Sequence, residues 1–390
     1  MSTFIEEIER CVPTSSTDAI PWDRLERLFA PTCFSAMKTT PQNPLYHGEG
    51  DVYAHTKATA RELIKSSAFQ EFSQRKKTEL FLATVLHDVG KVKTTRMEDG
   101  AWTSPGHAST GARIVREFLW RDCGLCGTPE AIVFRETVCA LVRFHMVPGR
   151  LIESNDPERK VREIAARGEL ATDFSWNMLS TLAEADAKGR ISMEADDCLT
   201  RVRLAEIVAE EALCANAPYR FPDAFTRRAY LSGRDVAPGQ PLYDDSWGEV
   251  VLMSGLPGTG KDAWLRKNCP DLPTISLDEI RKELRIAPTD DQGRVAQLAE
   301  ERAKELLRNK RPFVWNSTNV TRDIRRKQIG LFERYGARVR IVYLETDWAT
   351  RIERNVGREN VVPESAVERL LGKTELPTLD EAQNVQWICV

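Results

Sequence analysis

The stretch His87-Asp88-Val89-Gly90-Lys91 is the most informative part of this sequence, because it indicates both a helical fold and a site. It ends an apolar segment with helical spacing, and the 5 histidines of the chain all lie between positions 47 and 145. Imidazole and carboxylate groups hold divalent metals, and such a site with open positions can activate water against a phosphoester. A His-Asp pair by itself is usually incidental. With His55 upstream and Asp186 downstream, the pattern predicts a metal centre.

A second motif, Gly255-Leu-Pro-Gly-Thr-Gly-Lys261, follows the apolar run Val250–Met253. Glycines let backbone N–H groups approach an anion closely, and the start of a helix adds positive potential. Because the motif ends in Gly-Lys between a predicted strand and a predicted helix, it predicts a phosphate-binding loop whose lysine reaches the β and γ phosphates of a nucleotide. The residues expected to bind the nucleotide here are Gly255, Gly258, Thr259, Gly260, Lys261 and Asp262.

Asp262 departs from the usual form of this loop, in which a Ser or Thr hydroxyl holds Mg²⁺. The next residue, Ala263, does not replace that hydroxyl. Two interpretations stay open: the Asp262 carboxylate helps to hold the metal, directly or through water, or metal binding is impaired.

The hydrophobic pattern divides the chain into two domains, as its length of 390 residues also predicts. Apolar residues recur at helical spacing from about 50 to 213, which predicts an all-helical bundle. Beyond 249, β-branched runs alternate with helical stretches, which predicts an α/β domain with a parallel sheet. The expected boundaries are an N-terminal helical extension at 1–40, the bundle at 41–214, a Pro- and Gly-rich linker at 215–248, and the α/β domain at 249–390.

Composition places few limits on the partners of the chain. The formal net charge of −3 neither requires nor excludes nucleic acid, so any phosphate-binding surface must be local. The 9 cysteines are scattered and are expected to be reduced thiols of a cytosolic protein. No apolar run approaches the roughly 18 residues of a membrane span. We therefore expect a cytoplasmic protein with no membrane partner.

Asp278 and Arg281 follow a short predicted strand and lie three residues apart, on one face of the next helix. A carboxylate at a strand end can accept the proton of an attacking hydroxyl, and the arginine can hold a phosphate of the acceptor. The alternative is an N-cap aspartate beside a surface arginine. Further on, Arg322, Arg325 and Arg326 are expected on a solvated helix face rather than along a phosphate backbone.

The histidines and aspartates of the first half resemble those of the HD phosphohydrolase superfamily, whose fold is a helical bundle. The match covers roughly 45–190, and it implies that His55, His87, Asp88 and Asp186 bind the first metal. His107 and His145 resemble the second-metal ligands of the binuclear branch, with Asp88 bridging. Lys91 resembles the lysine that contacts phosphate in this superfamily; the alternative is a solvated surface lysine.

The sequence Ala185–Arg190 is similar to the HD modules attached to RNA nucleotidyltransferases. By that likeness, Lys188 and Arg190 would hold a terminal phosphate. Three interpretations of His47 stay open: a substrate contact, a residue behind the metal ligands, and a polar loop residue.

The second half resembles the 5'-hydroxyl polynucleotide kinase branch of P-loop phosphotransferases. The resemblance rests on the phosphate loop, on Asp278-x-x-Arg281, and on an arginine before Val-Pro in Arg354-Asn-Val-Gly-Arg358-Glu-Asn-Val-Val-Pro363. It implies that Asp278 is the general base, that Arg281 grips the acceptor phosphate and that Arg358 steadies the donor phosphates. Residues 316–319 are expected to line the same cleft.

Taken together, the order of the two halves resembles the HD-Pnk family of bacterial nucleic-acid end-healing enzymes. The resemblance implies an HD site that removes 2',3'-cyclic, 2'- or 3'-phosphates and a P-loop site that transfers an NTP γ-phosphate to 5'-hydroxyl ends. The implied cofactors are ATP or another NTP with Mg²⁺, and one or two ions of Mn, Ni, Co, Zn or Fe. The implied partners are RNA or DNA ends and a ligase that acts afterwards; a homodimer is left open.

Two other functions stay open at this point. In the first, a nucleotide phosphatase is fused to a small-molecule kinase. In the second, a P-loop that senses nucleotide without chemistry gates the HD hydrolase, and Asp262 is the main support for this alternative.

Overall fold

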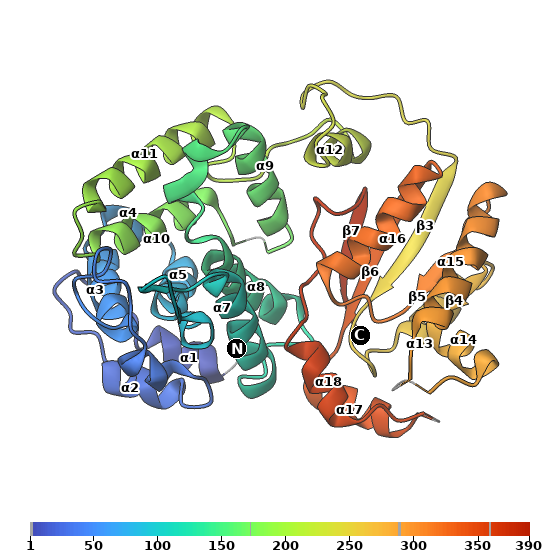
Figure 1. The fold of residues 1–390 in the computed structure, drawn as a ribbon, viewed down its shortest axis with the longest axis horizontal. Coiled ribbons are helices and arrows are strands. Elements are labelled where there is room, and N and C mark those ends of the chain that lie inside the picture. The colour runs from blue at the N-terminus through green and yellow to red at the C-terminus, as the bar shows by residue number, and fades with distance from the viewer. Residues whose placement is uncertain (1–2, 172, 288–289, 359) are drawn as a thin grey trace. The chain divides into compact units, whose positions relative to one another are not determined.

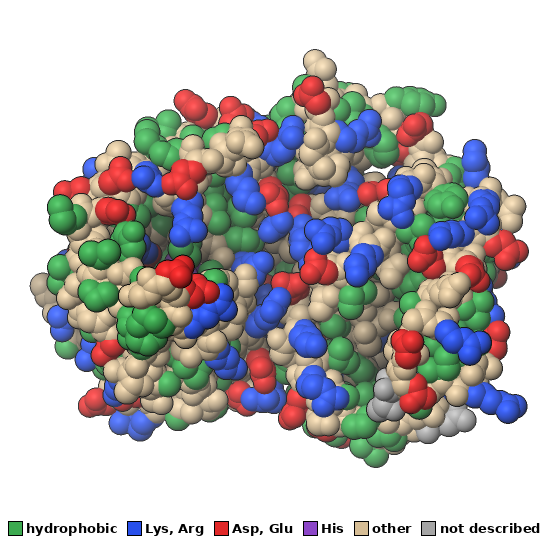
Figure 2. Space-filling view, in the orientation of Figure 1, with side chains coloured by type: hydrophobic (Ala, Val, Ile, Leu, Met, Phe, Trp, Pro, Cys, Tyr) green, Lys and Arg blue, Asp and Glu red, His purple; other side chains and the backbone are tan. Residues whose placement is uncertain are grey.

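The computed structural model describes residues 3–171, 173–287, 290–358 and 360–390. The chain forms two compact units, one made of residues up to Cys126 with Glu130–Tyr219, and one made of Gly127–Pro129 with Arg220–Val390. Among the described residues, no helix is long and apolar enough to cross a membrane. On the face shown in Figure 2, acidic and basic side chains are intermingled over each unit.

The first unit is built almost wholly of helices (Figure 1), as the sequence predicts. Leu80, Phe81 and Leu82 of one of them, α5, are fully buried on consecutive positions, so this helix is surrounded by the others. The helices are α1 Thr3–Glu9, α2 Trp22–Leu28, η1 Phe34–Thr39, α3 Val52–Lys65, α4 Ser67–Glu71, α5 Gln74–Leu86, α6 Lys91–Thr94, α7 His107–Glu117, η2 Phe118–Asp122, α8 Pro129–Phe144, η3 Pro148–Glu153, α9 Pro157–Gly168, α10 Trp176–Lys188 and α11 Ala195–Glu211.

One small hairpin corrects the expectation that this unit is entirely helical. Strands β1, Arg96–Glu98, and β2, Ala101–Thr103, pair antiparallel. Asp99 and Gly100 between them have φ of 50° and 79°. Asp-Gly is a favoured pair for a two-residue hairpin turn, because both central positions need a positive φ. The Asp99-Gly100 dipeptide could therefore have predicted this hairpin from the sequence.

The N-terminal extension contributes to the core of the first unit. The Phe4 and Phe29 rings contact Phe118 edge-on, with centroids 5.6 and 5.9 Å away. The Phe29 ring also lies 5.1 Å from that of Phe34. Burial of such aromatic side chains is a large stabilising contribution.

The second unit contains a five-stranded parallel sheet with the order β4-β5-β3-β6-β7, flanked by helices (Figure 1). This confirms the predicted α/β class. The central strand β3 is buried on both faces from Val250 to Ser254, as strands of parallel sheets usually are. The strands are β3 Gly248–Ser254, β4 Thr274–Ser276, β5 Val314–Asn316, β6 Ala337–Glu345 and β7 Asn384–Cys389. The helices are α12 Ala224–Leu231, α13 Lys261–Asn268, α14 Leu277–Leu284, α15 Gly293–Arg308, α16 Arg322–Arg334, α17 Trp348–Val356 and α18 Glu364–Leu371.

Helix α12 lies inside the segment that was expected to be a linker. Its Arg228 guanidinium forms two bonds with Glu333, of 2.7 and 2.8 Å, and donates to the Asp380 carbonyl at 2.9 Å. The adjacent Arg227 donates to the carbonyls of Leu379 and Gln383. Helix α12 is thus fixed to the second unit.

Arg325 corrects another expectation, because it does not lie on a solvated face. Its side chain is fully buried and forms a two-pronged ion pair with Glu381, with both distances 2.8 Å. Arg322 of the same helix pairs with Asp380, and only Arg326 is strongly exposed. Two of the three arginines therefore connect α16 to the C-terminal segment.

Candidate functional site

The end of α5 places the His-Asp pair in the centre of the first unit. His87 follows the last residue of the helix and keeps helical dihedrals, and Asp88 begins the turn that leads into α6. Gly90 lets the start of α7 approach this turn, since a Cβ there would lie 2.1 Å from the carbonyl oxygen of His107. The glycine therefore brings His107 close to His87 and Asp88.

Three of the four candidate histidine ligands present the same nitrogen to the site. In each ring Nδ1 contacts a backbone carbonyl, which can only accept a hydrogen bond, so Nδ1 carries the proton and Nε2 has a free lone pair. This arrangement is typical of metal-ligating histidines. The accepting carbonyls are those of Thr84 at 2.7 Å from His87, Ser104 at 2.8 Å from His107 and Val142 at 2.9 Å from His145.

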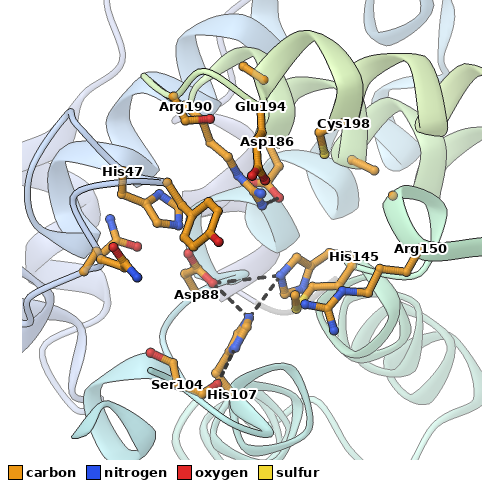
Figure 3. Close-up of a pocket in the computed structure, with 18 of the residues that line it drawn as sticks. His47, Asp88, Ser104, His107, His145, Arg150, Asp186, Arg190, Glu194 and Cys198 are labelled. Atoms are coloured by element: carbon orange, nitrogen blue, oxygen red, sulfur yellow. Dashed lines mark hydrogen bonds and ion pairs between the residues drawn. The ribbon is translucent and has the colours of Figure 1, made fainter. Parts of the chain in front are cut away.

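Asp88 divides the ligand atoms into two sets with its two carboxylate oxygens. Oδ2 lies 3.3 Å from His87 Nε2 and 3.8 Å from His55 Nε2. Oδ1 lies 3.3 Å from His107 Nε2 and 3.9 Å from His145 Nε2, and Figure 3 shows these two rings meeting Asp88 from one side. A carboxylate with ligand groups on both oxygens has the geometry needed to bridge two ions.

All six predicted metal ligands come together in three overlapping groups. Within each group the ligand atoms lie within 4.8 Å of one another. The groups are His55, His87 and Asp88; His87, His145 and Asp186; and Asp88, His107 and His145.

Several atoms in this cluster fit a divalent metal better than any protein partner. His87 Nε2 and Asp88 Oδ1 are buried and have no hydrogen-bond partner in the described part of the chain. The Nε2 atoms of His107 and His145 lie 3.4 Å apart, so two lone pairs face each other. Burial, with the nearby His87 and His107, lowers the pKa of His145 to about 3, which keeps its imidazole neutral. Neutral nitrogens with carboxylate oxygens suit Mn, Fe, Co, Ni or Zn.

Lys91 and Arg190 bring positive charge to this cluster. Lys91 is buried, and its Nζ lies 2.7 Å from Asp88 Oδ2 and 2.8 Å from Gln42 Oε1. Arg190 pairs with Asp186. Burial by itself would raise the pKa of each aspartate, but these cations and the histidines hold it well below its usual value. Both carboxylates therefore stay ionised.

Lys188 lies outside the site, contrary to its predicted role. Its Nζ pairs with Glu184 one helical turn earlier, at 2.8 Å, and its side chain is 39% exposed. It does not line the cavity of about 700 Å³ that opens over the cluster, whereas Arg190 and His47 do. On α10, Lys188 follows the cluster residue Asp186 by two positions, and side chains two positions apart on a helix are rotated by about 200°, so Lys188 faces away from the cluster.

Glu49 is a residue of this site that the sequence analysis missed. Its Oε1 lies 2.8 Å from His47 Nδ1 and 2.7 Å from His55 Nδ1, and its Oε2 accepts a bond from the Ile191 N–H. Burial opposes its charge, but these bonds lower the pKa of Glu49 below its usual value. Glu49 thus orients His55 so that Nε2 faces Asp186, 2.8 Å away. The sequence feature that could have identified Glu49 was its position two residues after His47, just before α3.

The phosphate loop of the second unit connects β3 to α13, as predicted. Gly255, Gly258 and Gly260 have φ of 141°, 87° and 86°. A Cβ at Gly255 would lie 2.5 Å from the Leu344 carbonyl oxygen, so the tight path of the loop requires glycine there. Lys261 Nζ donates to the Gly255 and Leu256 carbonyls at 2.9 Å. Burial lowers the pKa of Lys261 to about 8.

Asp262 lies in the first turn of α13 and lines the cavity beside this loop. Its Oδ1 accepts a 2.7 Å bond from the Asn316 side chain at the end of β5. Ser317 and Thr318 also line the cavity, but Asn319 is buried and bonds to the Met253 carbonyl. The prediction for residues 316–319 therefore fits the first three of them.

Asp278 lies between two arginines. Arg281 forms an ion pair with Oδ1 of Asp278, and Arg358 approaches its Oδ2 at 3.4 Å. The N-cap of α14 is Ser276, whose hydroxyl accepts from the Glu279 N–H. The capping alternative for Asp278 is therefore wrong, and its carboxylate, 66% exposed, faces the cavity.

The cavity over the phosphate loop has a volume of about 1060 Å³ and holds cations that sequence reasoning did not single out. Arg354 lies in α17, Arg369 lies in α18, and Lys373 follows that helix. With Lys261, Arg281 and Arg358, they give a cavity suited to several phosphates. Arg369 and Lys373 lie four residues apart after the Val-Pro pair, and this spacing could have indicated that both belong to the phosphate-binding cavity.

The fold and the two sites define a chain that joins a helical metal-binding domain to a P-loop α/β domain. Residues 52–196 match the family model of the HD domain, and residues 250–377 match that of an AAA domain. The chain thus carries an HD domain followed by a kinase-like P-loop domain, in the order predicted.

Two curated relatives have matching segments of 147 residues. Heterogeneous nuclear ribonucleoprotein U-like protein 2 of Mus musculus is 31% identical there, and its Homo sapiens counterpart is 27% identical. Each alignment covers 33% of this chain and 20% of the relative. The chain therefore spans about a fifth of the length of these relatives.

Proposed function

We propose that this protein is a bifunctional enzyme that heals nucleic-acid ends. In this proposal the HD domain removes 2',3'-cyclic, 2'- or 3'-phosphates, and the P-loop domain phosphorylates 5'-hydroxyl ends with an NTP. A strand treated in this way has the ends that a separate ligase joins.

The position of Asp278 carries the kinase half of the proposal. A carboxylate at the cavity can accept the proton of an acceptor hydroxyl, and Arg281 beside it suits an acceptor that itself carries a phosphate. Such an acceptor is a nucleotide within a strand or a 3'-nucleotide, rather than a free nucleoside. Lys261 and Arg358 would neutralise charge on the transferred γ-phosphoryl group as the bond to the β-phosphate breaks.

The cluster around Asp88 supports the hydrolase half. A divalent ion held by its imidazoles and carboxylates would activate water for attack on phosphorus. Lys91, fixed against Asp88 and Gln42, would stabilise the negative charge that develops on the phosphoryl oxygens. Arg190 would position the phosphate on the Asp186 side of the cavity.

The test uses one oligonucleotide with a 5'-hydroxyl and a 3'-phosphate, incubated with ATP, Mg²⁺ and Mn²⁺. We expect Asp88→Ala to abolish loss of the 3'-phosphate and spare 5' phosphorylation, and Lys261→Ala to do the reverse. RNA and DNA versions are both needed, and the names of the two ribonucleoprotein relatives support including RNA. If the wild type leaves both ends unchanged but hydrolyses mononucleotides, the end-healing proposal is wrong.

Asp262 favours a second candidate, in which the P-loop senses nucleotide and regulates the HD domain. Its carboxylate stands where a magnesium-binding hydroxyl is expected and bonds to Asn316. This candidate requires that ATP is bound without transfer of phosphate, and that bound ATP changes the rate of the HD reaction. Measuring hydrolysis of the 3'-phosphate with and without ATP, in a protein without kinase activity, separates the two candidates.

A further inference from the structure

One arginine of the HD cavity is not committed to an acidic partner. The cavity is lined by Lys91, Arg150, Arg190 and Arg201 among its basic side chains. Lys91 and Arg190 pair with the cluster aspartates, and Arg201 pairs with Glu153 and Asp197. Within the described ranges of the chain, no acidic side chain pairs with Arg150.

Local structure fixes the position of Arg150 relative to the cluster. It lies in η3, which begins three residues after the candidate ligand His145. Pro148 and Leu151 on either side are buried, and the Arg150 N–H bonds to the Val147 carbonyl at 3.0 Å. The side chain extends from η3 into the cavity on the side of His145, opposite His47 (Figure 3).

Arg150 is more exposed to solvent than the cations that contact the cluster. Lys91 is only 7% exposed and contacts Asp88, so it lies at the bottom of the cavity beside the candidate metal ligands. Arg150 is exposed and reaches the outer part of a cavity of about 700 Å³. That volume is far more than one phosphate group needs and is typical of sites for whole small molecules.

We propose that Arg150 determines specificity by binding the phosphodiester that precedes the terminal nucleotide of the substrate. A strand has this second phosphate, whereas a 3'-mononucleotide lacks it. Arginine forms two parallel bonds with a phosphate, and an arginine free of acidic partners can form them without breaking an ion pair. The inference rests on the proposed phosphatase activity of the HD domain, and it names a polynucleotide as its substrate.

The experiment compares three substrates that differ in size: p-nitrophenyl phosphate, a 3'-mononucleotide and a trinucleotide with a 3'-phosphate. The variants are Arg150→Ala and Arg150→Lys. Arg201→Ala is the matched control, because Arg201 lines the same cavity but is held by Glu153 and Asp197. Bound Mn²⁺ and the melting temperature are measured for each variant to show that the fold and the cluster are intact.

We expect Arg150→Ala to raise KM for the trinucleotide about tenfold with little change in kcat, which is the effect of losing one charged hydrogen bond. The two smaller substrates should be unaffected, Arg150→Lys should recover part of the loss, and Arg201→Ala should resemble the wild type. The slope of log KM against log salt for the trinucleotide should also decrease, by about 0.7 for one lost phosphate contact.

Equal losses on all three substrates, or no loss on any, would overturn the role of Arg150. A different result overturns the end-healing proposal: a wild type that hydrolyses p-nitrophenyl phosphate but neither the mononucleotide nor the trinucleotide. The two failures are therefore distinguishable in one set of assays.

Discussion

Glu49 Oε1 lies 2.7 Å from His55 Nδ1, and this contact turns Nε2 of His55 toward Asp186. We expect Glu49→Gln to lower the affinity for Mn²⁺ by about 10- to 100-fold, as is usual when a group that orients a ligand is lost. Titration of the metal-free protein with Mn²⁺ measures this effect. Glu98→Gln, in the exposed hairpin, is the control. An unchanged affinity in Glu49→Gln would show that packing alone orients His55.

Asp262 distinguishes two interpretations of the phosphate loop. If its carboxylate helps to hold Mg²⁺, Asp262→Asn should raise the Mg²⁺ concentration for half-maximal kinase activity by about tenfold. Asp262→Ser, which supplies the usual hydroxyl, should restore it. Asp271→Asn, at an exposed position, is the control. If Asp262→Asn has the same Mg²⁺ dependence as the wild type, the carboxylate does not serve the metal.

Lys261 should make nucleotide binding sensitive to pH. Burial lowers its pKa to about 8 in the free protein, and a bound phosphate should raise that pKa again. Affinity for ATP without metal should thus be constant below about pH 7 and fall as the pH rises through 8, by at most about tenfold per unit. Calorimetry in buffers of different ionisation enthalpy should show proton uptake near pH 8.5. In Lys261→Arg the charge persists, so any residual binding should lack this dependence.

The buried pair Arg325–Glu381 should be sensitive to loss of one partner. Arg325→Met removes the two-pronged partner of the buried Glu381 and leaves Arg322, 3.5 Å from its Oε1, as a weaker one, so the free energy of unfolding should fall by about 3 kcal/mol. Exchange of both residues for apolar ones should recover much of that loss. Arg326→Met, with a side chain 76% exposed, is the control and should change little. Denaturant unfolding of the second unit measures all three variants.

The sequence predicted elements whose signals are local. The strand β3 is a continuous apolar run followed by the glycine motif, and the His-Asp pair ends an apolar helix. Edge strand β7 carries a weaker signal, because most of its residues are only half-buried and its one apolar run, Trp387–Cys389, is short. Parallel pairing with β6 decides its conformation, and this partner lies some 40 residues earlier.

The residues that were missed depend on long-range contacts. In the sequence Glu49 has the character of an ordinary polar loop residue, because the contact between its carboxylate and the Ile191 N–H joins distant segments of the chain. Arg325 shares a helix face with the buried Ile329 and Phe332, and the distant Glu381 supplies the ion pair that allows its guanidinium to be buried there. Lys188 was predicted from its place in a motif, but its side chain pairs with Glu184 away from the cavity. Spacing predicts which face a residue occupies, but not what covers that face.

Asp88 and the five candidate ligands around it come from five segments of the first unit, spread from His55 to Asp186. An ion bound there would act as a cross-link that the unfolded chain cannot form. The melting temperature of this unit should then depend on free metal, with each tenfold excess over Kd adding about 1.4 kcal/mol of stability. All groups of candidate ligands in the described residues belong to this unit. Depletion of metal in a cell would thus weaken one half of the protein and leave the other folded.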